Sequence, residues 1–220
     1  MKQDSALSIE PAAADAPLGQ REKNKLDKLR RIKEATHHLF TNRGFDETTT
    51  REIALRAGVA LGTVFTYADN KRDLLFLVAN DDLEAATVKA RSTVGPGKPL
   101  VAALIEIFRP HYSFFARQPA LSRLMLREMT FYDSGTQAAR FKTTRENLLA
   151  LIRDVVQLAR ADATISSARR DDDIAWVMFC IYQVELRRWL VPEKPAVTRG
   201  LATLRGSLEL CVEGLSPRGA

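Results

Sequence analysis

The chain has 220 residues, of which 45% are hydrophobic and 27% are charged, and its formal net charge at pH 7 is +6. These proportions are ordinary for a globular protein. No apolar stretch of about 18 residues and no secretory signal pattern occurs, which excludes a membrane partner and predicts a cytoplasmic protein. Cys180 and Cys211 stand far apart in apolar helical patterns, so we interpret both as buried small side chains rather than metal ligands.

The chain begins with an extension and a basic helix. Residues 1–20 contain two prolines and no apolar periodicity, which predicts a disordered N-terminal extension. From Lys23 to Asn42, apolar residues recur at helical intervals, and Gly44 is expected to end this helix. Residues 21–31 hold six Lys or Arg against two acids. This charge is either a solvated helix face or, as we favour beside the motif that follows, a contact with DNA phosphates.

A helix-turn-helix is predicted between Thr49 and Tyr67. Thr49 and Glu52 have the spacing of a capping box, which starts a helix. Gly58 follows where the chain must take a positive φ at the helix end. A second short helix is expected from about Leu61 to Tyr67. Two short helices joined by a glycine-containing turn are typical of a helix-turn-helix.

The second short helix has the chemistry of a DNA contact. Gly62 carries no side chain, so a phosphate backbone can approach closely, and neighbouring hydroxyls can bond to phosphates or base edges. Lys71 adds a cation at the start of the next helix, where the helix N-terminus also favours a phosphate. We expect backbone contacts from Thr49, Thr63, Tyr67 and Lys71, and contacts nearest the bases from Arg51, Leu61, Gly62, Phe65 and Thr66.

These residues resemble the DNA-binding domain of TetR/AcrR-type transcriptional regulators. The resemblance covers roughly 45 to 50 residues in matching order and spacing. It is carried by Gly44-Phe45, Thr48-Thr49, Ile53-Ala54, Ala57-Gly58-Val59, Gly62-Thr63-Val64-Phe65, Tyr67 and Lys71. The departures from the family pattern are Thr50, Ala60, Ala68 and Arg72, where an apolar residue, a capping Ser, a packing Phe and an acid are common.

The rest of the chain predicts helices and no strands. A helix from Lys71 to about Ser92 comes first, and Pro99 and Pro119 each suit the start of another. Pro110 falls inside the pattern between them and predicts a kink or a break. A longer helix follows from about Gly135 to Ala161. We therefore expect an all-α protein with a helix-turn-helix domain over residues 21–70. The family resemblance implies that residues 71–220 form an effector-binding and dimerisation domain.

Two further helices are predicted at the end of the chain. The first starts at Asp171–Asp173, where negative charge suits the helix dipole. The last carries a near-heptad seam at Val197, Leu201, Leu204, Leu208, Cys211 and Leu215. Such seams either close the chain's own core or pack against a two-fold copy. The family resemblance implies dimerisation through these helices, so we expect a homodimer with Ile181, Val184, Leu201, Leu204, Leu208 and Cys211 at the interface.

The resemblance also implies a small effector whose binding weakens the hold on DNA. The candidate effector-binding residues are Phe108, Arg109, Tyr112, Met125, Glu128, Met129, Trp176 and Phe179. An aromatic and sulfur-rich set of this kind is also typical of a plain core. Arg109 and Glu128 lie on apolar stripes and need partners. Either they fix the polar end of a mostly apolar ligand, or they pair with each other or with Arg123 or Arg127.

The predicted function is a sequence-specific transcriptional regulator, a repressor released from a palindromic operator by a small, mostly apolar effector. Its two half-sites should lie about 34 to 36 Å apart. The alternative is an architectural or protein-recruiting DNA-binding factor of the same fold with no effector. Three histidines, no G-x-S-x-G, no phosphate loop and no ligand-spaced Cys or His predict neither an enzyme, a metal site nor a cofactor.

Overall fold

The computed structural model describes residues 19–214, which contain nine α-helices, one short 3₁₀ helix and no strand. The all-α prediction is confirmed. Residues 1–18 of the expected N-terminal extension, and Leu215 of the expected last seam, lie outside the described residues. Within residues 19–214, no helix is long and apolar enough to cross a membrane.

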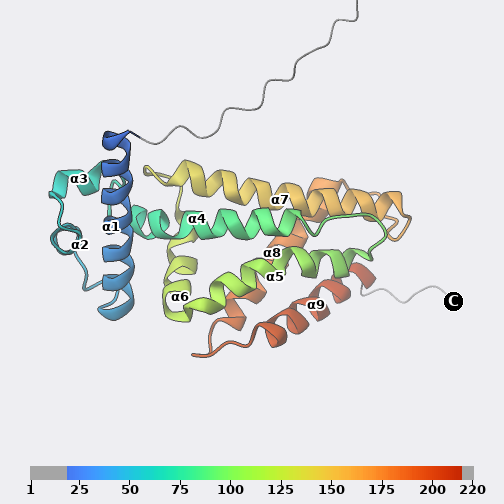
Figure 1. Cartoon of the computed structure of the whole chain (residues 1–220). Coiled ribbons are helices and arrows are strands. Elements are labelled where there is room, and N and C mark those ends of the chain that lie inside the picture. The colour runs from blue at the N-terminus through green and yellow to red at the C-terminus, as the bar shows by residue number, and fades with distance from the viewer. Residues whose placement is uncertain (1–18, 215–220) are drawn as a thin grey trace, which may run out of the picture.

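The first three helices form a small unit at one end of an elongated helical body (Figure 1). We call this unit the head; it comprises α1 (Gln20–Asn42), α2 (Thr50–Ala57) and α3 (Leu61–Phe65). The body comprises α4 (Lys71–Arg91), α5 (Leu100–Arg117), α6 (Pro119–Glu128), the 3₁₀ helix η1 (Met129–Phe131), α7 (Ala138–Ala161), α8 (Asp171–Trp189) and α9 (Val197–Glu213).

The capping signals of the head are present as predicted. The Thr49 hydroxyl accepts a hydrogen bond from the backbone N–H of Glu52, and the Glu52 carboxylate accepts one from the backbone N–H of Thr49 at 2.8 Å. Gly58 ends α2 in the left-handed region, with φ of +61°. Ile53 and Val64 are fully buried, and α2 packs against both α1 and α3.

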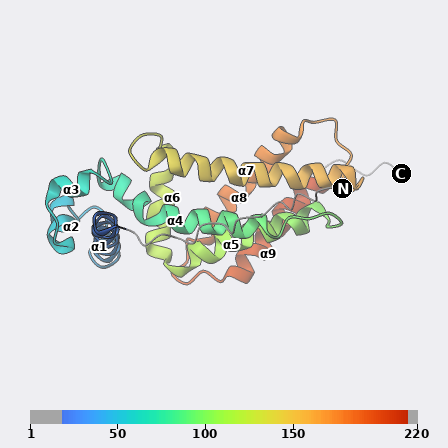
Figure 2. The same ribbon diagram turned by 45° about the horizontal axis from the view of Figure 1, so that its top comes forward.

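Helix α4 leads from the head into the body and packs against α5, α6 and α7 (Figure 2). Helix α5 in turn contacts α9, and α7 contacts α8. Pro110 does not break α5, which runs from Leu100 to Arg117. Because Phe108, His111 and Tyr112 are all buried around Pro110, packing on both sides of the proline offsets the loss of one backbone hydrogen bond.

The prediction that both cysteines are buried is wrong, because Cys180 and Cys211 are exposed. Helix α8 turns Phe179 and Tyr182 inward instead, and α9 turns Leu204 and Leu208 inward. Both helices are apolar on more than one side, so periodicity alone did not select the buried side.

Candidate DNA-binding head and effector cavity

Helix α3 presents the side chains that we expect to meet DNA. Val64 is its only buried residue and anchors the helix to the head. Gly62, Phe65 and Thr66 are exposed, while Leu61 and Thr63 are half-buried. Ala60 precedes α3 and offers no side-chain cap to the first N–H groups of this helix. Arg51, on α2, is also exposed.

Two of the expected phosphate contacts have partners within the head. The hydroxyl of Tyr67 donates to the carbonyl of Lys25 on α1 at 3.2 Å. The ammonium of Lys71 donates to the carbonyl of Asp46 at 3.1 Å and lies 4.5 Å from the centre of the Phe45 ring. Both side chains therefore fix the end of α3 against the rest of the head, and their DNA contacts stay predictions.

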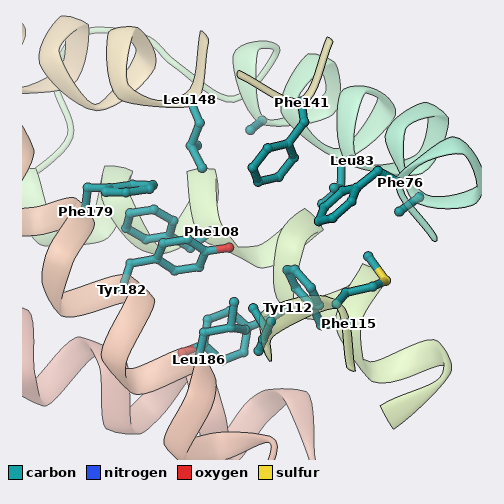
Figure 3. Close-up of a cluster of buried hydrophobic side chains, with 14 of the residues drawn as sticks. Phe76, Leu83, Phe108, Tyr112, Phe115, Phe141, Leu148, Phe179, Tyr182 and Leu186 are labelled. Carbon is teal, nitrogen blue, oxygen red and sulfur yellow. The ribbon is translucent and has the colours of Figure 1, made fainter. Parts of the chain in front are cut away.

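A cavity of about 340 Å³ lies in the body. Its walls come from α4, α5, η1, α7 and α8, and Figure 3 shows Phe141, Leu148, Phe179 and Tyr182 converging on this region. Three of the predicted effector-binding residues line it, namely Met129, Trp176 and Phe179. The other lining residues are Leu83, Thr87, His111, Phe115, Thr130, Phe141, Thr144, Arg145, Leu148, Cys180, Tyr182, Gln183, Val184 and Arg187.

The remaining candidates for the effector site lie elsewhere in the body. Phe108, Tyr112 and Met125 are core residues with at most 2% of their surface exposed, and Phe108 stacks on Tyr182 with ring centres 4.3 Å apart. Arg109 is exposed and lies beside α9. From α5, only His111 and Phe115 line the cavity.

Glu128 also lies outside the cavity lining, and it pairs with arginines. Its carboxylate accepts from Arg127 Nε at 2.8 Å and from Arg72 Nε at 2.9 Å. Arg127 was one of the partners expected for Glu128, whereas Arg72 was not anticipated. These two arginines neutralise the carboxylate. Glu128 therefore forms a structural ion pair and does not supply a polar group to the cavity.

The charged residues of the cavity are Arg145 and Arg187, which the sequence did not single out. Arg187 is half-buried and donates to the backbone carbonyl of Gln183 at 2.8 Å and to its side-chain oxygen at 2.7 Å. Within residues 19–214, neither arginine has a carboxylate within 4.0 Å, and no Asp or Glu lines the cavity. Partial burial lowers the pKa of Arg187 from its usual value. The cavity therefore joins apolar walls to uncompensated positive charge.

His111 supplies a neutral polar group to the same cavity. Its side chain is almost fully buried, with Nδ1 3.2 Å from the carbonyl of Ile107 and Nε2 3.2 Å from the hydroxyl of Thr87. Burial lowers the pKa of His111 to about 4, so the ring is neutral near pH 7. Because a carbonyl only accepts, Nδ1 carries the proton, and Nε2 is left as an acceptor.

The expected dimer seam on α9 needs a correction. Leu201, Leu204 and Leu208 have at most 4% of their surface exposed and face α5 within the same chain, so they are not available to a second copy. Among the other expected interface residues, Val184 and Cys211 are exposed and Ile181 is half-buried. The accessible apolar surface of α8 is formed by Trp176, Val177 and Val184.

Comparison with known proteins finds a family match for one part of the chain. The family model for bacterial regulatory proteins of the tetR family matches residues 32–78. The chain is similar to the HTH-type transcriptional repressor KstR of Rhodococcus jostii, at 27% identity over 61% of this chain and 64% of that protein. It is also 33% identical to an HTH-type transcriptional regulator of Staphylococcus aureus, over 28% of this chain and 33% of that protein. Both matches span less than two thirds of the relative.

Solved structures match over more of the chain. FadR of Thermus thermophilus, a TetR-family transcriptional repressor in complex with lauroyl-CoA, has a TM-score of 0.65 and 26% identity, covering 87% of this chain and 97% of that one. FadR of Bacillus subtilis, in complex with stearoyl-CoA, has a TM-score of 0.66 but 17% identity, covering 85% and 99%, and supports the fold alone. These relatives are transcriptional regulators and not enzymes. Residues 32–78 therefore match the tetR family of bacterial regulatory proteins, and the chain shares the fold of a TetR-family transcriptional repressor.

Proposed function

We propose that the protein is a repressor that binds a palindromic operator as a homodimer and is released by a small, mostly apolar effector. In this proposal, residues 21–70 bind DNA and residues 71–220 bind the effector and dimerise. The observation that carries it is the apolar cavity of about 340 Å³, which is bounded by α4, the helix that continues from the head. An effector in that cavity would act on the placement of the head only through its different affinity for two arrangements of the body.

The homodimer is proposed to form on the exposed surface of α8. Trp176, Val177 and Val184 expose between 45% and 56% of their surface. Apolar residues exposed together on one helix favour an interface. A two-fold dimer would present two copies of α3 to successive major grooves, about 34 Å apart, which is why the operator should be a palindrome.

The proposed effector is an apolar chain with an anionic group. Apolar walls suit a hydrocarbon chain, and the uncompensated charges of Arg145 and Arg187 suit a carboxylate or phosphate. The lauroyl-CoA complex of the Thermus thermophilus relative, at 26% identity, supports the same class. Three probes separate the sources of the anionic group: lauroyl-CoA, laurate, and CoA without an acyl chain.

The test is a titration of these probes into the protein bound to a fluorescent DNA fragment that it has selected. We expect an acylated probe to release the DNA and CoA alone to leave it bound. Arg187→Gln should weaken the effect of the active probe about tenfold, since a hydrogen-bonded charge is lost. Arg199→Gln, which changes an exposed arginine on α9, is the control. Retention of DNA at saturating concentrations of all probes would refute this effector class, and absence of DNA binding would refute the regulator itself.

A further inference from the structure

One stretch of the body lines the cavity and also contacts the end of α3, which is called here the recognition helix. This stretch, residues 128–141, is called here the bridging segment; it contains η1 and the first turn of α7. Met129, Thr130 and Phe141, near its two ends, line the cavity. Its middle, from Tyr132 to Gln137, contacts the turn between α3 and α4.

Two carboxylates receive most of these contacts, Asp69 in the α3–α4 turn and Asp73 in the first turn of α4. Asp73 is fully buried and accepts hydrogen bonds from the hydroxyl of Tyr132 and from the backbone N–H of Gln137. Asp69 accepts from the backbone N–H of Thr136 at 3.0 Å and from its hydroxyl at 2.8 Å. The side-chain amide of Gln137 donates to the carbonyl of Tyr67 at 3.0 Å. The turn that ends the recognition helix is therefore bonded to the body.

Helix α3 depends on such support because it is short. It has five residues, one buried side chain and no side-chain cap at Ala60. A helix of this length is not stable by itself, so its position is set by what holds its ends. Val64 fixes its inner face, and the carboxylates of Asp69 and Asp73 fix the turn that follows it.

The path from the cavity to this turn is continuous. Phe141 lines the cavity, and its ring centre is 5.7 Å from that of Tyr132. Both rings contact Phe76 of α4, and Figure 3 shows Phe141 and Phe76 at one side of the cluster. The hydroxyl of Tyr132 then reaches Asp73. A displacement of Phe141 or Met129 by a molecule in the cavity thus reaches the α3–α4 turn through packed side chains.

We infer that Tyr132, Thr136 and Gln137 are positioning residues for the recognition helix, and that filling the cavity loosens their hold on the α3–α4 turn. The second part rests on the proposed function of the cavity. The first part does not, because it depends only on the contacts between the bridging segment and the turn.

The positioning role is tested with isosteric removal of two hydroxyls. Tyr132→Phe/Thr136→Val removes one hydroxyl donor to Asp73 and one to Asp69, while the backbone N–H donors remain. Thr136→Val alone, on an exposed residue, serves if the double variant is too unstable. The matched control is Tyr112→Phe/Thr203→Val. It removes a buried hydroxyl that has no hydrogen-bond partner among residues 19–214 and a hydroxyl that, in the same range, bonds within α9.

Hydrogen exchange of the free protein is the first readout. We expect the amides of residues 66–73 to exchange about tenfold faster in the test variant, with α5, α7 and α8 unchanged, because hydrogen bonds to charged groups are lost there. DNA binding should weaken about tenfold with an unchanged salt dependence, since the phosphate contacts remain. Thr136→Ser, which keeps the hydroxyl, should show the amide exchange and the DNA affinity of the wild-type protein. Equal exchange in the test and control variants would overturn the positioning role, even if the protein proves not to bind DNA.

The link to the cavity is tested by filling it with a side chain. Thr144→Phe places a ring from α7 into the cavity, and Thr144→Ser is the control that fills nothing. We expect Thr144→Phe to accelerate exchange of residues 66–73 in the wild-type background and to add less in the Tyr132→Phe/Thr136→Val background, because two of the hydrogen bonds between the bridging segment and the turn are already removed. No acceleration, or equal acceleration in both backgrounds, would overturn the link.

Discussion

Arg72, in the first turn of α4, donates a hydrogen bond from Nε to the carboxylate of Glu128 at the end of α6, across 2.9 Å. Glu128 also accepts from Arg127, which lies 3.6 Å from the carboxylate of Asp46 in the head. Arg72 stands where an acid is frequent in similar domains, and in this chain an acid on the body balances it. These charges connect the head to the body beside the bridging segment.

Glu128→Gln should therefore lower the free energy of unfolding by about 1 kcal/mol. The Glu128 side chain is 12% exposed but its Arg72 partner is 43% exposed, so solvent screening limits the effect. Asp82→Asn, which breaks an exposed pair with Arg117, should cost less than about 0.5 kcal/mol. Urea unfolding of the two variants makes the comparison. Equal costs would show that the Glu128 pair behaves as an ordinary surface ion pair.

Gly135→Ala should destabilise the protein more than the addition of one methyl group suggests. Gly135 has φ of +117°, and an added Cβ would lie 2.7 Å from Asp73 Oδ1, so both the backbone and the buried carboxylate resist the change. We expect a loss of about 2 kcal/mol or more in thermal or urea unfolding. Gly95→Ala, where φ is not positive and an added Cβ meets open space, is the control and should be close to neutral. A Gly135→Ala protein as stable as Gly95→Ala would contradict this packing.

The buried neutral ring of His111 should make the free energy of unfolding decrease as the pH falls. Its pKa is about 4 in the folded protein against 6.5 in an unfolded chain, so the unfolded state binds more protons between these values. Stability contributed by the neutral ring is complete above about pH 6.5 and decreases as the pH falls toward 4, by about 3 kcal/mol in total. Urea unfolding at pH 7, 5.5 and 4.5 should show a flatter dependence for His111→Gln. Parallel curves for the two proteins would exclude His111 as the cause.

Lys71→Ala should weaken DNA binding uniformly. Its ammonium lies over the Phe45 ring and beside the Asp46 carbonyl, near the end of α3, where a phosphate can be shared. We expect weaker binding to all DNA sequences and a salt slope reduced by about one. Lys89→Ala, in the last turn of α4 and far from the head, is the control. A loss confined to one operator sequence would contradict a phosphate contact.

The head could be predicted from the sequence because its signals are local. Thr49, Glu52 and Gly58 act through hydrogen bonds and backbone angles within a few residues, so their roles follow from spacing alone. The cavity could not be predicted in the same way. Arg145 and Arg187 belong to two helices that meet only in the folded body, and no pattern along either helix distinguishes them from other surface arginines.

The seam on α9 shows a second limit of sequence patterns. Leu201, Leu204 and Leu208 recur at the spacing that suits either a partner helix of a second copy or a helix of the same chain. The pattern determines that this side of α9 is covered, but not by what. In the structure α5 covers it, while Val184 of the expected interface stays exposed on α8 together with Trp176 and Val177.

The most direct test of the account is selection of genomic DNA fragments by the purified protein, read at two salt concentrations. We predict recovery of a palindromic site with half-sites about one helical turn apart, bound by two copies of the chain, with affinity that falls steeply as salt rises. Recovery of fragments with no shared sequence would contradict a sequence-specific dimeric regulator and would leave a DNA-binding protein that recognises the phosphate backbone alone.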